Sequence, residues 1–130
     1  MIAIDASALL AILKKEPEGE AFARCIATAG GGVISAVNFW EVLVRAEAID
    51  GAAGRAEAET LLDTLNIEVV PAASEQARAA ADAFARYGRR TPADLNLGDC
   101  FAYALAAEHG DGLLFKGADF PKTDIKVVLA

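Results

Sequence analysis

Four acidic residues, Asp5, Glu41, Asp99 and Asp119, are placed where carboxylates could act together. Asp5 and Asp119 each follow a short apolar run typical of a buried strand, while Glu41 and Asp99 lie in helical segments that follow short connections. Ordinary roles explain each acid singly, since Asp5 could cap a helix, Asp99 could meet a helix dipole and Asp119 could occupy a turn. Their joint placement favours convergence at one edge of a sheet.

Converging carboxylates repel one another, and the pKa of each rises unless a cation offsets the charge. Mg²⁺ or Mn²⁺ suits such a site, because a hard divalent cation takes oxygen ligands and keeps water molecules for a phosphate substrate. The bound cation would lower the pKa of water and polarise a phosphoryl oxygen. The four acids therefore predict metal-assisted hydrolysis of a phosphate ester.

Glu41 carries the most weight because a structural role explains it least well. An ion pair with Arg45, one helical turn later, contributes only about 0.3 to 0.5 kcal/mol on a surface. The other residues on the same helical face, Val37, Val44 and Ala48, are apolar. A surface ion pair does not account for a carboxylate among apolar positions.

Composition excludes several other chemistries. The chain has 130 residues, 12 Lys and Arg against 19 Asp and Glu, and a formal charge of −7. His109 is its one histidine, so the chain has no HExxH motif and no Cys/His zinc cage, and a Ser/His/Asp triad could be built only on His109. Cys25 and Cys100 lie in apolar helical stretches, and we expect both to be buried reduced thiols.

The acidic balance argues against broad, non-specific binding to nucleic acids or membranes, although a local basic patch remains compatible with it. The apolar start, residues 1–13, has no basic segment before it and is interrupted by Asp5. No run reaches the roughly 18 apolar residues that span a bilayer. We therefore expect a cytoplasmic protein without a membrane anchor.

The elements that would position the acids alternate between strand and helix, which predicts one α/β domain over residues 1–130 with a parallel sheet. Hydrophobic residues make up 55% of the chain, but 30 of them are alanine, which favours tightly packed helices around a modest core. Ligands bind such sheets outside the carboxyl ends of the strands. We expect strands at 2–4, 33–34, 67–70, 113–115 and 125–129, and helices at 7–15, 17–29, 35–51, 57–65, 74–87 and 97–109.

The chain resembles a known family, the PIN-domain ribonucleases, and specifically the VapC-type toxins of bacterial toxin–antitoxin pairs. The resemblance covers nearly all 130 residues and rests on residues 4–9, Glu41, 95–106, 114–120 and 123–125. It implies a single PIN-like domain, with a central, mostly parallel five-stranded sheet flanked by about six to seven helices.

The resemblance also implies roles for individual residues. Asp5, Asp99 and Asp119 would hold Mg²⁺, with Mn²⁺ as an alternative, and Glu41 would bind the ion directly or through water. Ser7 would support the carboxylates by hydrogen bonding.

Two further side chains, Asn96 and Asp124, belong to the supporting set that the resemblance implies. Residues 117–119, Gly-Ala-Asp, depart slightly from the family's frequent Gly-Asn-Asp or Gly-Asp-Asp. Asp124 is therefore the alternative to Asp119 as the fourth acid.

Basic residues near the same edge, Arg89, Arg90, Lys116 and Lys122, could contact RNA phosphates, with scattered solubility charges as the alternative. The resemblance implies a homodimer, a protein antitoxin that inserts a basic side chain into the acidic site, and cleavage of single-stranded or looped RNA that leaves a 5′-phosphate. Trp40 could stack on a base, but its helical position favours a core or dimer contact.

Two other functions stay open. One is a phosphoacceptor module of receiver type, with Asp5 phosphorylated and Lys116 on the phosphate. Such modules usually carry an acidic pair after the first strand, whereas Ile4 and Ala6 flank Asp5 here. The other is a catalytically silent PIN domain that only binds a partner.

Overall fold

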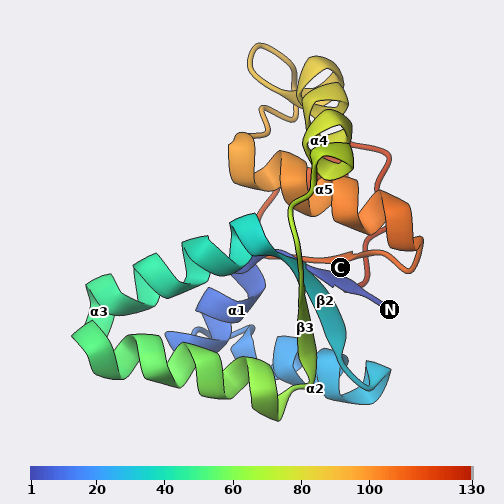
Figure 1. Cartoon of the computed structure of the whole chain (residues 1–130). Coiled ribbons are helices and arrows are strands. Elements are labelled where there is room, and N and C mark those ends of the chain that lie inside the picture. Colours follow the sequence, from blue (N-terminus) through green and yellow to red (C-terminus); the bar gives the residue numbers. More distant parts are fainter. Residues whose placement is uncertain (130) are drawn as a thin grey trace.

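The centre of the protein is a sheet of short parallel strands in the order β3-β2-β1-β4 (Figure 1). The computed structural model describes residues 1–129. The strands are β1 (Ala3–Ile4), β2 (Gly32–Ser35), β3 (Ile67–Val70) and β4 (Leu113–Leu114). The helices are α1 (Ala6–Leu13), α2 (Gly19–Ala29), α3 (Ala36–Thr64), α4 (Ser74–Tyr87), α5 (Leu97–His109) and the 3₁₀ helix η1 (Phe120–Lys122).

Alternate residues of the strands pack on opposite faces of the sheet. Ile2, Ile4 and Ile34 belong to a buried cluster shared with α1, α2 and α3. Ala3 and Val33 belong to a second cluster, shared with α4 and α5. Figure 1 shows α4 and α5 together on one side of the strands, apart from the other three helices. Helices therefore cover both faces, as a parallel sheet requires.

Side chains at the strand ends start the helices that follow. Asp5 comes directly after β1 and accepts a hydrogen bond from the backbone N–H of Ser7 at the start of α1. Ser35 ends β2, and its hydroxyl accepts a hydrogen bond from the N–H of Val37 in α3. Each cap satisfies a backbone donor that the helix itself leaves unpaired. The chain therefore passes from strand to helix without a loop at the carboxyl edge of the sheet.

The predicted strand at 125–129 is wrong. Over the described residues the sheet has four strands, and Val127 forms only an isolated parallel bridge with Leu113. Two backbone hydrogen bonds accompany this bridge, from Leu113 to Lys126 and from Val128 to Leu113. The segment therefore lies beside β4, but its pairing does not extend into a ladder. The expectation of a parallel sheet is confirmed.

The expected six to seven helices are also wrong, since residues 1–129 contain five α-helices and η1. The segments at 35–51 and 57–65 belong to one element, α3, which folds into two arms that double back on each other (Figure 1). The bend lies at Asp50 and Gly51, where Gly51 has φ 59° and ψ −147°. A glycine can therefore reverse the chain here without a connecting loop.

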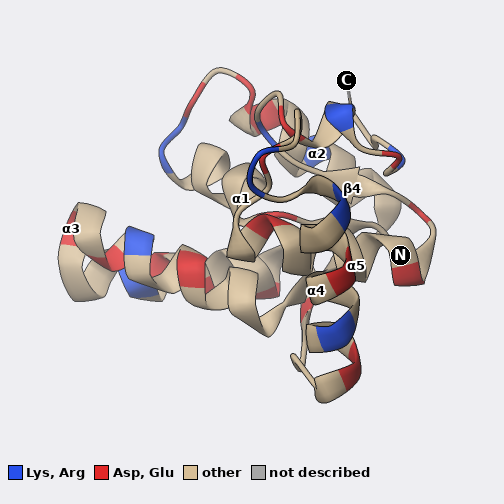
Figure 2. Cartoon of the chain, turned by 90° about the horizontal axis from the view of Figure 1, so that it is seen from above, with Lys and Arg blue, Asp and Glu red and all other residues tan. Residues whose placement is uncertain are grey.

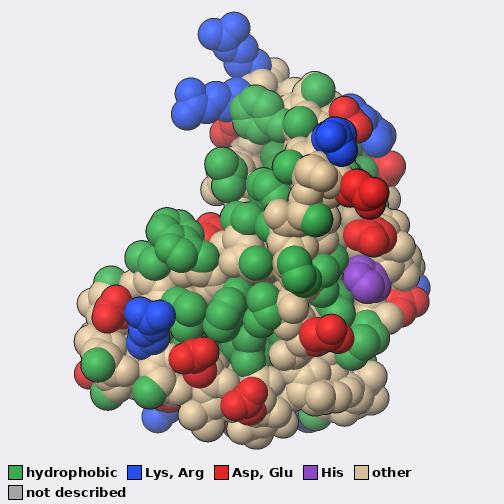
Figure 3. All heavy atoms as spheres, in the orientation of Figure 1, with side chains coloured by type: hydrophobic (Ala, Val, Ile, Leu, Met, Phe, Trp, Pro, Cys, Tyr) green, Lys and Arg blue, Asp and Glu red, His purple; other side chains and the backbone are tan. Residues whose placement is uncertain are grey.

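Several large apolar side chains remain on the surface, and Figure 3 shows hydrophobic groups gathered across the middle of one face. Trp40 is 62% exposed, so it is not a core residue, and Val44 and Ile49 on the same helix are also exposed. In the described part of the chain, no helix is both long and apolar enough to cross a membrane. Cys25 and Cys100 both carry free thiols, but only Cys100 is fully buried.

The bend in α3 predicts a specific sensitivity to substitution. Gly51→Ala should lower the free energy of unfolding by about 1–3 kcal/mol, because its backbone conformation is strained for any residue with a Cβ atom. The loss would not come from a clash, since nothing lies within 4 Å of the added Cβ. Urea unfolding measures this loss of stability, with a substitution at the exposed Ala56, Ala56→Ser, as the control. Equal stability of the two variants would contradict the role assigned to Gly51 in the bend.

Candidate metal centre

A cavity of about 410 Å³ at the carboxyl end of β1 brings together three of the predicted acids, Asp5, Glu41 and Asp99. They come from three separate elements: the end of β1, the first arm of α3 and the first turn of α5. Ser7 and Asn96 line the same cavity. The predicted convergence of carboxylates at the edge of the sheet is therefore present for these residues.

Asp5 is the most deeply buried of these acids, with 6% of its surface exposed. Ser7 holds its carboxylate through the backbone N–H at 3.1 Å and the hydroxyl at 2.6 Å. Burial raises the pKa of Asp5 to about 6, the Ser7 hydrogen bonds oppose that rise, and the charges of Asp99 and Glu41 add to it. The Ser7 oxygen also accepts a hydrogen bond from the Lys116 N–H at 2.9 Å, which joins the ends of β1 and β4.

Asp99 and Asn96 cap α5 reciprocally. The Asn96 N–H donates to the Asp99 carboxylate at 3.0 Å, and the Asp99 N–H donates to the Asn96 side-chain oxygen at 2.9 Å. This capping box fixes the orientation of the Asp99 side chain. Burial raises the pKa of Asp99, and the charges of Glu41 and Asp119 add to the rise. The supporting role expected of Asn96 therefore takes the form of a helix cap.

The apolar residues that share a helical face with Glu41 are not all buried, since Val44 is 44% exposed. Its partner is the fully buried Asn38, whose side-chain amide donates to the Glu41 carboxylate at 2.8 Å. Gly98 also lies close to Glu41, because a Cβ atom at Gly98 would come within 2.4 Å of the same carboxylate oxygen. Sequence reasoning missed Asn38, although its spacing of three residues before Glu41 places the two on one helical face.

The cations that line the cavity are Lys14, Arg45 and Lys116. Lys116 forms ion pairs with Glu16 and, at 2.7 Å, with Glu18, and these contacts raise its pKa. Lys14 lies 3.8 Å from Glu16. Within residues 1–129, Arg45 forms no ion pair with a carboxylate, so the Glu41–Arg45 pair considered as the ordinary explanation of Glu41 is absent. Lys14, Glu16 and Arg45 were not predicted as site residues, although Arg45 follows Glu41 by one helical turn.

Asp119 and Asp124, the two candidates for the fourth acid, are placed differently. Asp119 is exposed at the start of η1 and does not line the cavity, yet its charge raises the pKa of Asp99. Asp124 accepts a hydrogen bond from the Tyr103 hydroxyl and lies 3.5 Å from the Arg86 guanidinium. Its pKa is lowered, chiefly by the Tyr103 hydrogen bond. The structure therefore does not bring Asp124 to the carboxylate cavity.

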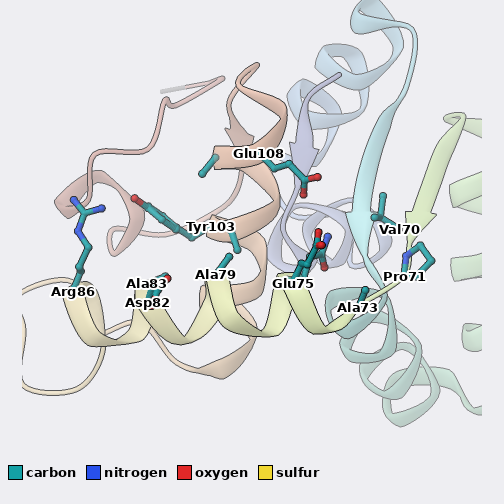
Figure 4. A pocket seen from close by; sticks show the side chains of 13 residues that line it. Val70, Pro71, Ala73, Glu75, Ala79, Asp82, Ala83, Arg86, Tyr103 and Glu108 are labelled. Atoms are coloured by element: carbon teal, nitrogen blue, oxygen red, sulfur yellow. The ribbon is translucent and has the colours of Figure 1, made fainter.

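Arg86 and Tyr103 lie side by side at one end of a larger hollow, about 740 Å³, between α4 and α5 (Figure 4). This hollow contains none of the predicted acids, and Glu75 and Glu108 line its opposite end. Although this hollow is larger than the carboxylate cavity, it is the weaker candidate site, because none of the residues predicted to act in catalysis lines it.

The remaining basic candidates, Arg89, Arg90 and Lys122, do not line the carboxylate cavity. Arg89 borders a separate apolar hollow between α4 and α5. Figure 2 shows basic segments in separate places along α3, α4 and the loops rather than in one stripe. These three residues lie away from the cavity, so their positions do not support the expected contacts with RNA.

The donor set at the cavity fits a hard divalent cation. Asp5, Glu41 and Asp99 offer only oxygen atoms. Burial raises the pKa of Asp5 and Asp99, the charges of neighbouring carboxylates add to the rise, and a bound cation would offset both effects. Within residues 1–129, no three acidic, His or Cys side chains are yet close enough to form a ready-made metal cage. Binding would therefore draw the carboxylates closer together.

Comparison with known proteins decides the family. The family model described as PIN domain matches residues 2–126. The chain belongs to the PIN-domain family. Ribonuclease VapC30 of Mycobacterium tuberculosis is 40% identical over 126 residues, which cover 96% of this chain and 96% of that protein. This match argues against the receiver-type alternative. That alternative would also require Lys116 to break its ion pairs with Glu16 and Glu18 in order to bind a phosphate.

Solved structures agree with this PIN fold. The crystal structure of VapC20 from Mycobacterium tuberculosis, a toxin described as cleaving the sarcin-ricin loop, gives a TM-score of 0.79 at 14% identity and covers 97% of both chains. A chain of a toxin–antitoxin complex from Klebsiella pneumoniae gives 0.69 at 18% identity, covering 92% of this chain and 90% of that chain. At these identities the likeness establishes the fold alone.

The raised pKa of Asp5 predicts how stability depends on pH in metal-free buffer. The folded protein keeps this proton up to about pH 6, whereas the ordinary carboxyl pKa is 3.8. The folded state therefore binds more protons between these values, so its stability falls as pH rises through them, by about 3 kcal/mol at most.

Asp5→Asn should flatten this slope, because asparagine still accepts the Ser7 hydrogen bonds but carries no charge. Urea unfolding in metal-free buffer from pH 4 to pH 7, the range that spans both pKa values, tests this expectation. Above pH 6 the variant should be the more stable protein. An identical slope in both proteins would show that Asp5 does not carry the burial cost assigned to it.

Proposed function

We propose that this PIN domain is a divalent-metal-dependent endoribonuclease that acts in the cytoplasm as the toxin of a toxin–antitoxin pair. The observation that carries the proposal is the single cavity lined by Asp5, Glu41 and Asp99 at the carboxyl end of β1. The name of the 40% identical relative, a VapC ribonuclease, supports the activity. The substrate class would be single-stranded or looped RNA.

The ion would be Mg²⁺, with Mn²⁺ as a substitute, held by Asp5, Asp99 and Glu41. Asp119, whose charge already acts on Asp99, would complete the set from the start of η1. When bound, the ion supplies a water of lowered pKa and polarises the phosphoryl oxygen. Ser7 and Asn96 orient the carboxylates of Asp5 and Asp99 through the hydrogen bonds described above.

Arg45 and Lys14 are our choice for contacts with the RNA phosphates, because both line the cavity. Arg45 is better suited than Lys116, whose ammonium group is already paired with Glu16 and Glu18. A phosphate would have to displace both carboxylates to bind Lys116. Arg45 and Lys14 would attract the RNA, and the cavity carboxylates would hold the ion that assists hydrolysis.

The partners we propose are a protein antitoxin and a second copy of the chain. A basic antitoxin side chain would offset the carboxylate charge that raises the pKa of Asp5 and Asp99. Trp40, Val44 and Ile49 supply exposed apolar surface on α3 for either contact. The name of the Klebsiella pneumoniae complex supports the antitoxin as a partner of this fold.

Removal of one cavity carboxylate should abolish the activity. Asp99→Asn is expected to lower the rate of RNA cleavage by at least about 100-fold, since it removes a charged ligand while the amide still caps α5. The assay follows a labelled RNA with Mg²⁺, with Mn²⁺ and with EDTA. The exposed Asp82→Asn on α4 is the charge-matched control and should cleave as the wild type does.

Cleavage that persists in Asp99→Asn or in EDTA would overturn the metal-dependent mechanism. Absence of both cleavage and divalent-metal binding in the wild type, measured by calorimetry at neutral pH, would favour a silent, partner-binding PIN domain instead.

Expression of the chain alone should arrest bacterial growth, because no antitoxin would then cover the acidic cavity. Asp5→Asn should relieve the arrest at an equal protein level. Sequencing of RNA 5′ ends after brief expression of both forms would identify the cleaved RNA. New 5′-phosphate ends that are equally abundant in both strains would argue against cleavage at this cavity.

A further inference from the structure

Asn38 is a polar side chain in the protein interior with no access to solvent. Its amide nitrogen donates two hydrogen bonds, one to the Glu41 carboxylate at 2.8 Å and one to the Gly98 carbonyl at 2.9 Å. The first partner lies on the same helix, α3, and the second lies in the first turn of α5, next to Asp99. Asn38 therefore joins the two helices that supply acids to the cavity.

The orientation of the Asn38 amide follows from these partners. Both are oxygen acceptors, so a flipped amide would place its own oxygen against a carboxylate and a carbonyl. In the observed orientation, the Asn38 oxygen is buried without a hydrogen-bond donor. A buried acceptor without a partner lowers stability, and an apolar side chain would avoid that loss. Stability alone therefore does not explain an asparagine at this position.

Gly98 also lies against the Glu41 carboxylate. A Cβ atom at this position would lie 2.4 Å from one carboxylate oxygen and 2.7 Å from the other, closer than any side chain could remain. The absence of a side chain at Gly98 thus lets Glu41 lie directly against the first turn of α5. The Asn38 amide and the Gly98 backbone together fix where this carboxylate sits relative to Asp99.

We propose that Asn38 is a positioning residue, which acts through Glu41 and holds its carboxylate against α5 so that Glu41 and Asp99 can serve the same cation. The inference rests on the proposed metal-dependent function and adds a residue that the cavity lining itself does not include. Asn38 touches neither the substrate nor the ion. Its effect should therefore appear first in the affinity for the metal.

The test compares two variants, each of which disturbs the position of the Glu41 carboxylate. Asn38→Leu removes both donors but keeps apolar bulk, and Gly98→Ala places a methyl group against the carboxylate. Calorimetric titration of the metal-free protein with Mn²⁺ should show affinity lowered roughly 10- to 100-fold in each. The Mn²⁺ concentration that gives half-maximal RNA cleavage should rise by a similar factor, and cleavage should recover at high Mn²⁺.

Leu62→Ala is the matched structural control, because Leu62 is buried in the second arm of α3 and does not line the cavity. It should lower the unfolding temperature at least as much as Asn38→Leu, yet leave Mn²⁺ affinity unchanged. Equal weakening of Mn²⁺ binding in Leu62→Ala would overturn the inference, since general destabilisation would then explain the effect.

The remaining outcomes separate this inference from the proposed function. Wild-type protein that binds Mn²⁺ and cleaves RNA, together with unaltered Mn²⁺ affinity in Asn38→Leu and Gly98→Ala, would overturn the role of Asn38 alone. Wild-type protein that neither binds Mn²⁺ nor cleaves RNA would overturn both.

Discussion

Repulsion between carboxylates is the constraint on which the rest of this structure depends. Asp5, Glu41 and Asp99 share one cavity. Burial raises the pKa of Asp5 and Asp99, and the charges of the neighbouring carboxylates add to that rise. Each is held there by a donor close to it in sequence: Asp5 by Ser7, Asp99 by Asn96 and Glu41 by Asn38. Because each acid has its own local restraint, the protein can assemble the cavity before a cation arrives. The sheet needs only to bring the three restrained groups together.

Local patterns in the sequence predicted those parts of the fold that local chemistry determines. The strand at 67–70 and the helices at 74–87 and 97–109 are present with the expected bounds, because turn and cap residues mark their ends. Local patterns also singled out Asp5, as an acid that follows a strand, and Asp99, as an acid in the first turn of a helix. The expected fifth strand forms only an isolated bridge at Val127, because the composition of a segment does not show how far it pairs with its neighbour β4.

Long-range packing determines the features that the sequence did not reveal. The contact between Asn38 and Gly98 joins residues 60 positions apart, and no pattern at either residue indicates it. Lys116 looked available for phosphate, but Glu16 and Glu18 reach it from the start of the chain. In both cases the partner comes from a distant segment, so spacing along one helix or strand carries no information about it.

The hydrogen bond from the Lys116 N–H to the Ser7 hydroxyl has a consequence for how the site closes. It ties the chain to the end of β1 just before Gly117, whose φ of 124° suits a pivot. Asp119 lies two residues beyond that pivot and outside the cavity lining. An approach of Asp119 to a bound ion would then be a movement of one loop about this hinge, alongside the closer approach of the Asp5, Glu41 and Asp99 side chains. We expect assembly of the metal site to be a local event that leaves the sheet undisturbed.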